Sequence, residues 1–106
     1  MSQWIRVLDL EDLKEDIHVF VFEGEKIAII RKGEKEFYAI QDKCSHATAF
    51  LSEGEVEGYE IICPRHGARF DIRTGKNLCL PAVVPVKSYP VKIEDGALWI
   101  EWSNED

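Results

Sequence analysis

The amino-acid sequence predicts a small all-β domain, an antiparallel sandwich or barrel. Short runs of β-branched and aromatic residues recur along the chain, and glycine-containing turn signals separate them. In SYPVKIEDGALWIEW (88–102), apolar and polar residues alternate on both sides of an Asp-Gly pair, which is the pattern of a β-hairpin. With 106 residues, the chain is expected to form one domain, 1–106.

The first forty residues are expected to form one separate strand and a three-stranded meander. A strand is predicted at 4–7, and residues 10–16 (LEDLKED) form one helical turn or a loop. The meander strands are predicted at 18–22, 27–31 and 37–40. Two-residue hairpin turns are expected at Glu23-Gly24 and Lys32-Gly33, because glycine accepts positive φ.

The rest of the chain continues in short strands. VEGYEIIC (56–63) contains two strands that turn at Gly58, and ARFDI (68–72) forms another. The closing hairpin is expected to pair 89–93 with 98–102. Pro90 must then lie on a sheet edge or at a bulge, because proline cannot donate a ladder hydrogen bond.

Composition excludes several classes of function. The net charge of −7 disfavours binding to nucleic acid or to an anionic membrane. No apolar run approaches the ~18 residues of a membrane helix, and the acidic N-terminus lacks the pattern of a signal peptide, so we expect a soluble cytoplasmic protein. Three cysteines in such a compartment are better suited to metal binding than to disulfides.

Two cysteine–histidine pairs form the chemical pattern of the chain. The pairs are Cys44-x-His46 and Cys63-x-x-His66, and each follows a predicted strand. Thiolate and imidazole suit zinc or an iron–sulfur cluster. Structural zinc sites commonly pair Cys with Cys and His with His, whereas this chain mixes the two in each loop. The mixing fits a Rieske [2Fe–2S] centre, in which two Cys bind one iron and two His bind the other.

With CSH at 44–46 and CPRHGARFDIRTGK at 63–76, the chain resembles the Rieske-type ferredoxins, and in particular the low-potential type associated with oxygenases. The resemblance covers essentially the whole chain. It implies one [2Fe–2S] cluster in a two-loop cluster-binding subdomain at about 42–82. It also implies that Cys44 and Cys63 bind the inner iron, and that His46 and His66 bind the iron nearer to solvent.

Departures from the high-potential members of this group indicate a low reduction potential. Those proteins carry an additional cysteine in each loop, joined as a disulfide, and here neither loop has one. They also place serine and tyrosine after the second histidine, where this chain has Ala68 and Phe70. Fewer hydrogen bonds to sulfur stabilise the reduced cluster less, so we expect a potential near the low end of about −150 to +300 mV.

The resemblance implies a one-electron carrier and not an enzyme. Its expected partners are an NAD(P)H-dependent flavin reductase as donor and a terminal oxygenase or similar redox protein as acceptor, both bound transiently. Two other functions stay open from the sequence. One is a small subunit or redox sensor of a larger oxidoreductase, and the other is a zinc-binding interaction module without redox function.

Residues around the pattern have simpler interpretations. Cys79 is expected to be a buried small apolar residue, and His18 a structural or surface histidine. Trp99 and Trp102 are expected to pack within the sheet. The resemblance implies that Pro81 and Pro85 belong to a segment covering the cluster.

Basic residues concentrate near the second cysteine–histidine pair. Residues 61–93 contain six Lys or Arg and one acidic residue, whereas residues 1–60 contain fourteen acidic and seven basic ones. Arg65, Arg69 and Arg73 are interpreted as surface arginines paired with nearby acids. The alternative is that they meet an acidic patch on a redox partner.

Overall fold

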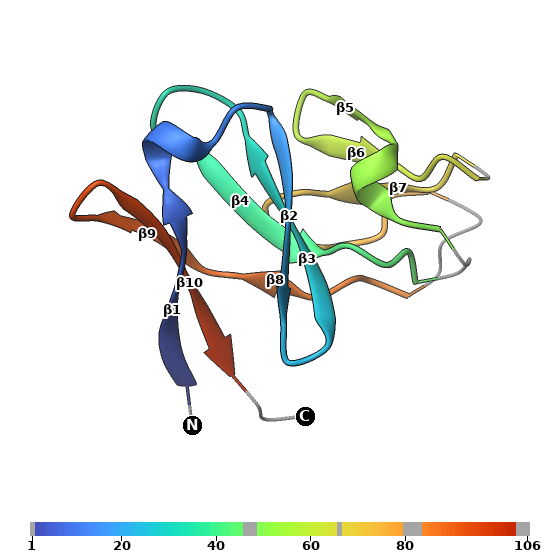
Figure 1. The fold of residues 1–106 in the computed structure, drawn as a ribbon. Helices are drawn as coiled ribbons and strands as arrows, with labels where there is room; N and C mark the ends of the chain where they lie inside the picture. Colours follow the sequence, from blue (N-terminus) through green and yellow to red (C-terminus); the bar gives the residue numbers. More distant parts are fainter. Residues whose placement is uncertain (1, 46–48, 66, 80–83, 104–106) are drawn as a thin grey trace.

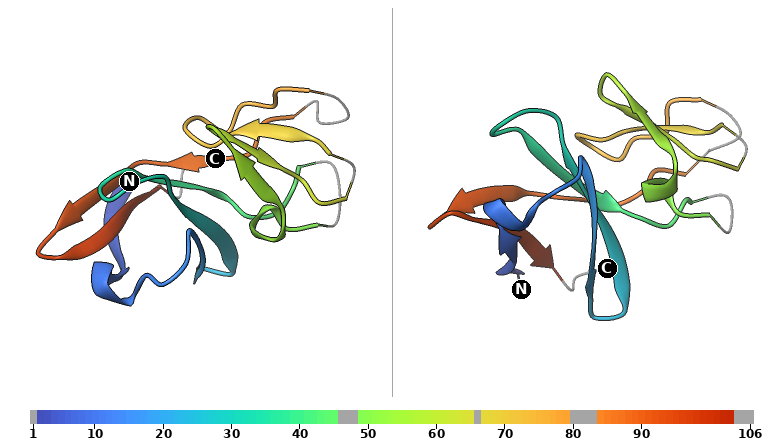
Figure 2. Two further views of the ribbon diagram at one scale, coloured as in Figure 1. Left: turned by 90° about the horizontal axis from the view of Figure 1, so that it is seen from above. Right: turned by 45° about the horizontal axis from the view of Figure 1, so that its top comes forward.

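The structure is a computed structural model that describes residues 2–45, 49–65, 67–79 and 84–103, arranged in three antiparallel sheets (Figure 1). The first sheet has the order β1-β10-β9, the second β2-β3-β4-β8 and the third β5-β6-β7. The four-stranded sheet lies in the middle, with β9 and β10 on one side and β5–β7 on the other (Figure 2). The expected all-β architecture is confirmed.

The strand bounds follow the predicted runs closely. The strands are β1 (Ser2–Asp9), β2 (Ile17–Phe22), β3 (Glu25–Arg31), β4 (Phe37–Gln41), β5 (Glu55–Glu57), β6 (Glu60–Ile62), β7 (Arg69–Asp71), β8 (Ser88–Tyr89), β9 (Val91–Glu94) and β10 (Ala97–Ser103). Two short 3₁₀ turns join them, η1 (Leu10–Asp12) and η2 (Leu51–Glu53). No described helix is long and apolar enough to span a membrane.

Two of the three predicted tight turns are confirmed. Glu23 and Gly24 have φ values of 53° and 77°, and Asp95 and Gly96 have 54° and 72°. Paired positive φ angles are those of a type I′ turn, whose twist matches that of the flanking strands. The prediction of a two-residue turn at Lys32-Gly33 is wrong. Residues 32–36 form a longer loop, in which the Lys32 amide donates to the Glu36 carbonyl over 2.9 Å.

Pro90 divides the strand predicted at 89–93. β8 ends at Tyr89 and pairs with β4, whereas β9 begins at Val91 and pairs with β10. The chain therefore passes from the second sheet to the first at a residue that has no backbone N–H. The Pro90 carbonyl still accepts a 2.9 Å hydrogen bond from the Glu101 amide.

β3 is the central strand of the protein, and four consecutive residues of it, 27–30, are fully buried. Since side chains alternate across a strand, Ile27 and Ile29 pack into one apolar core with Leu98, Ile100 and Trp102 of β10. Ala28 and Ile30 pack into a second core that includes both loop cysteines, Cys44 and Cys63. One strand thus joins the first sheet to the part of the chain that carries the cysteines.

The two C-terminal tryptophans differ in burial. Trp102 is buried and its ring stacks on that of Tyr89. The ring centroids of Trp102 and Phe22 lie 5.0 Å apart in a T-shaped arrangement. Trp99 is half-buried, and its indole N–H donates to the Glu94 carbonyl. His18 is also half-buried, on β2.

A shared carboxylate links the second sheet to the third. Glu36 accepts hydrogen bonds from the hydroxyls of Tyr38 on β4, at 2.5 Å, and of Tyr59 in the β5–β6 turn, at 2.7 Å. These bonds, the one from Tyr38 first, lower the pKa of Glu36. The bond to Glu36 raises the pKa of Tyr38 to about 12 and also raises that of Tyr59.

We expect this network to make the protein sensitive to alkaline pH. The folded-state pKa of Tyr38 lies above its unfolded value of about 10. Its contribution to stability is therefore complete below pH 10 and is lost as the pH rises through the folded pKa of about 12. In Glu36→Gln, ultraviolet titration should show tyrosinate forming at lower pH than in the wild type. The free energy of unfolding of this variant, measured with denaturant, should also fall less steeply above pH 10 than that of the wild type. An unchanged tyrosinate titration would contradict the assignment.

Candidate metal centre

Cys44 and Cys63 are buried cysteines, 3% and 1% exposed, in one apolar cluster. Cys44 follows β4, and Cys63 follows β6, so each stands after a strand as predicted. They come from different sheets and meet on the same side of β3. The structure therefore brings together the two thiols of the predicted ligand set. The two histidines of the pattern, His46 and His66, lie outside the described residues.

Both cysteine loops close with the same backbone hydrogen bond. The Cys44 amide donates to the Ala49 carbonyl at 2.9 Å, and the Cys63 amide donates to the Ala68 carbonyl at 2.7 Å. Each loop thus returns to its cysteine after five residues, and the sequence places one histidine of the pattern inside each closed segment. This repeated closure was not visible in the sequence, because the spacing of the ligands differs between the loops.

The second loop depends on glycine at two positions. Gly67 has a φ of 75°, a region that glycine adopts without strain, and its amide donates to the Cys63 carbonyl at 3.1 Å. Gly54 lies against the strand that leads to Cys63, where an added Cβ would be 1.9 Å from the Ile62 carbonyl oxygen. A side chain at position 54 would therefore displace the backbone next to the cysteine.

A third segment lies beside the first loop. The Ser45 hydroxyl donates to the Val84 carbonyl at 2.6 Å, which ties the first loop to residues 84–87. Val84 and Leu78 are exposed apolar side chains, 54% and 41% accessible. Pro85 is also exposed. Pro81 lies outside the described residues, so the expected covering role of this segment stays a prediction.

The prediction of a buried Cys79 is wrong. Cys79 is an exposed free thiol, and its Sγ lies 3.8 Å from the Gly67 carbonyl oxygen. The neighbouring Leu78 is held by its backbone, because its amide donates to the Arg69 carbonyl. This places the segment along the outside of β7, away from either core.

Arg69 and Arg73 pair with nearby acids, as the simpler interpretation predicted. Arg69 bridges Glu57 and Glu60 at 3.2 Å each. Arg73 binds both carboxylate oxygens of Asp71 at 3.1 Å, and this contact lowers the pKa of Asp71. Arg65 is exposed and lies within the second loop.

The donor set agrees with an iron–sulfur centre. No group of three His, Cys, Asp or Glu side chains forms among the residues that the structure describes. The described half of the ligand set, two buried thiols in an apolar environment, is the half that would bind one iron of a Rieske cluster. Burial shields those sulfur atoms from water, which is one of the factors that set the cluster potential.

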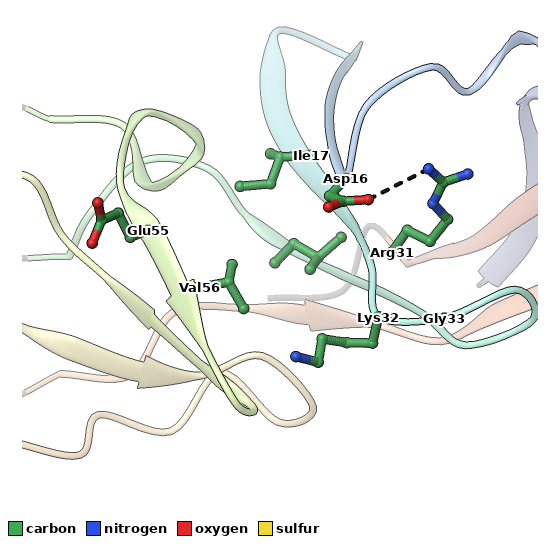
Figure 3. A pocket seen from close by; sticks show the side chains of 8 residues that line it. Asp16, Ile17, Arg31, Lys32, Gly33, Glu55 and Val56 are labelled. Atoms are coloured by element: carbon green, nitrogen blue, oxygen red, sulfur yellow. Dashed lines mark hydrogen bonds and ion pairs between the residues drawn. The ribbon is translucent and has the colours of Figure 1, made fainter.

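A groove of about 520 Å³ lies between β3 and β5, separate from the thiols (Figure 3). Asp16, Arg31, Lys32 and Val56 are among its lining residues, and the Arg31 guanidinium lies 3.4 Å from the Asp16 carboxylate. None of its lining residues is a thiol or an imidazole. The groove therefore takes no part in the candidate metal centre.

The fold and the buried thiol pair define the class of protein as a small iron–sulfur electron carrier. The chain matches the Rieske [2Fe-2S] domain over residues 3–90, and it belongs to this family. The match confirms the expected single [2Fe–2S] cluster and disfavours the zinc alternative.

Similar proteins are ferredoxins of oxygenase systems. The ferredoxin component of the naphthalene 1,2-dioxygenase system of Pseudomonas putida is 42% identical over 95% of this chain and 97% of its own length. The solved ferredoxin of carbazole 1,9a-dioxygenase from Nocardioides aromaticivorans IC177 has a TM-score of 0.84 at 37% identity, covering 92% of this chain and 95% of that one. A chain in the solved complex of reduced oxygenase and oxidized ferredoxin in carbazole 1,9a-dioxygenase has a TM-score of 0.82 at 33% identity, with coverage of 92% and 91%. The expectation of a Rieske-type ferredoxin that carries electrons, and not of an enzyme, is confirmed.

Adding a hydroxyl at position 68 is expected to raise the reduction potential by a measurable amount. Ala68 is fully buried in the same apolar core as both thiols. In Ala68→Ser, a hydrogen bond that strengthens on reduction by about 1.4 kcal/mol would raise the midpoint potential by ~59 mV for one electron. Protein-film voltammetry measures this directly. Ala39→Ser, in the other core, is the matched control and should leave the potential unchanged.

Proposed function

We propose that Cys44, His46, Cys63 and His66 hold the cluster, and that the cluster-binding part spans about residues 42–82 of a single domain. The observation that carries this proposal is the pair of buried thiols that share one apolar core, on two loops with the same closure. When bound, the cluster accepts and releases one electron at a time. The chain contributes a dry environment for the sulfur atoms and two loops held by backbone hydrogen bonds, which keep the ligands in place.

We also propose that the chain delivers these electrons to a terminal oxygenase in the cytoplasm. The support is that the relatives are ferredoxin components of dioxygenase systems and that one of them is solved in complex with its oxygenase. An NAD(P)H-dependent flavin reductase is proposed as the donor from the resemblance alone. A carrier must release each partner after transfer, so we expect small interfaces, below about 1,200 Å².

The surface beside the loops is suited to brief contact. Leu78 and Val84 offer apolar area, and Arg65 adds a positive charge to a chain of net charge −7. Apolar contact supplies affinity, whereas a charge at the rim mainly changes the rate of association. We therefore assign the docking surface to these residues around the two loops.

The ligand set can be tested by replacing each thiol. Wild-type protein should contain two irons and two sulfides per chain, and it should give an EPR signal only after reduction, when the iron pair holds an odd electron. Cys44→Ser and Cys63→Ser should lose both the iron and the signal, and Cys79→Ser should keep both. A Cys63→Ser variant with full iron content would exclude the proposed set. Co-purification with a large subunit would instead favour a role as the small subunit of a larger oxidoreductase.

Arg65→Glu should slow electron transfer to the oxygenase more at low than at high ionic strength, because salt screens charges near the surface. Stopped-flow reduction of the acceptor at two salt concentrations measures the effect. Lys14→Glu makes the same charge change at an exposed residue next to η1 and serves as the control. Equal rates for wild type and Arg65→Glu at both salt concentrations would remove Arg65 from the docking surface.

A further inference from the structure

The two ligand loops differ in what holds their stems. The second loop stands on a ladder between β6 and β7, with paired residues from Glu60–Asp71 to Ile62–Arg69. The first loop has one isolated bridge, Lys43 with Phe50, in place of a ladder. Two strands held by one bridge are weakly restrained, so other contacts must hold the first loop in place.

Asp42 supplies several of those contacts, in addition to the Ser45–Val84 hydrogen bond. Asp42 is 1% exposed. Among the residues that the structure describes, it is the only polar or charged one that is buried. Its amide donates to the Lys26 carbonyl on β3 at 3.0 Å, and its carbonyl accepts from the Leu51 amide at 2.6 Å. Its carboxylate accepts two hydrogen bonds from Ser52. The Ser52 amide donates to Oδ1 at 2.7 Å, and the Ser52 hydroxyl donates to Oδ2 at 3.0 Å.

These contacts also begin the 3₁₀ turn η2. The residue that precedes the turn, the N-cap Phe50, makes no side-chain hydrogen bond to it. The amides of Leu51 and Ser52, which open the turn, donate to the Asp42 carbonyl and carboxylate instead. One residue thus binds β3 on one side and the returning end of the loop on the other.

A buried carboxylate is a costly way to fill space. Removing a charge from water is unfavourable unless hydrogen bonds compensate, and an apolar side chain of similar size would pack without that cost. The cost is understandable if the carboxylate has a positional role, because it can bind an amide and a hydroxyl of the same residue at once.

We propose that Asp42 is a positioning residue for the first ligand loop. Its carboxylate clasps Ser52, closes the stem of the loop at residues 43–45 and 49–51, and so holds the Cys44 thiol in the apolar core. The proposal rests on the proposed ligand set, and it assigns to Asp42 no contact with the cluster itself. It predicts that weakening the clasp opens the first loop and leaves the second, with its own ladder, closed.

The experiment uses the cluster-loaded protein and needs no redox partner. Loss of visible absorbance is followed after reduction in the presence of a ferrous-iron chelator. The freed thiols are alkylated and quantified one by one by mass spectrometry. Ser52→Ala removes one hydrogen bond, so cluster loss should be about fivefold faster, with Cys44 alkylated before Cys63. Asp42→Ala should accelerate the loss at least about tenfold, because it leaves the Ser52 amide without its acceptor.

Two further variants separate positioning from general destabilisation. Asp42→Asn can accept from the Ser52 amide and donate to its hydroxyl, so it should stay close to the wild-type rate. Glu53→Gln neutralises an exposed carboxylate of the same 3₁₀ turn and should change nothing. Should Asp42→Ala fail to fold, Ser52→Ala and Asp42→Asn still decide the question.

Simultaneous alkylation of Cys44 and Cys63 in Ser52→Ala, or a wild-type rate in both Ser52→Ala and Asp42→Ala, would overturn the proposal. If the wild-type protein contained no cluster, the proposed ligand set would fail separately. The order in which Cys44 and Cys63 are alkylated in that protein would still test the clasp.

Discussion

The burial of β3 on both faces is the constraint on which the rest of the structure depends. Residues 27–30 alternate between two apolar cores, so Ile27 and Ile29 hold the sheet of β1, β9 and β10. Ala28 and Ile30 hold the layer that carries both thiols. A single strand of branched apolar residues therefore sets the position of the ligand loops relative to the rest of the protein. The same strand receives the Asp42 amide at its Lys26 carbonyl, at the base of the first loop.

Two loops of different origin present their cysteines in the same way. Each cysteine amide reaches the carbonyl five residues ahead, and each thiol points into the shared core. The supports below the loops differ, with a ladder under Cys63 and a buried carboxylate under Cys44. In a Rieske ferredoxin, both supports would serve the same purpose, which is to keep the ligands in place. Ligands that stay fixed while the charge of the cluster changes keep the structural cost of each electron transfer small.

Exposed apolar side chains and the exposed Arg65 lie around the two loops. Arg69 and Arg73 are paired with carboxylates of the same layer, whereas Val84 beside the first loop and Leu78 beside β7 are exposed and apolar. The proposed docking surface thus carries the positive charge of Arg65 in a protein whose net charge is −7. Under the proposed function, electrons enter and leave at this end of the molecule. The Tyr38–Glu36–Tyr59 contacts hold the second and third sheets together away from this end.

Local rules were enough for much of this protein. The strand pattern, the two-residue turns at Glu23-Gly24 and Asp95-Gly96 and the Cys/His spacing could all be predicted from the sequence, because alternation and positive φ are properties of neighbouring residues. The tertiary structure alone decided that β1 pairs with β10, that the chain changes sheets at Pro90 and that Cys79 is exposed. It also decided the burial of Asp42, which in the sequence is one carboxylate among twenty acidic residues. Each of these depends on contacts between segments far apart in the chain, such as Asp42 with Lys26 and Ser52, and no local pattern encodes such contacts.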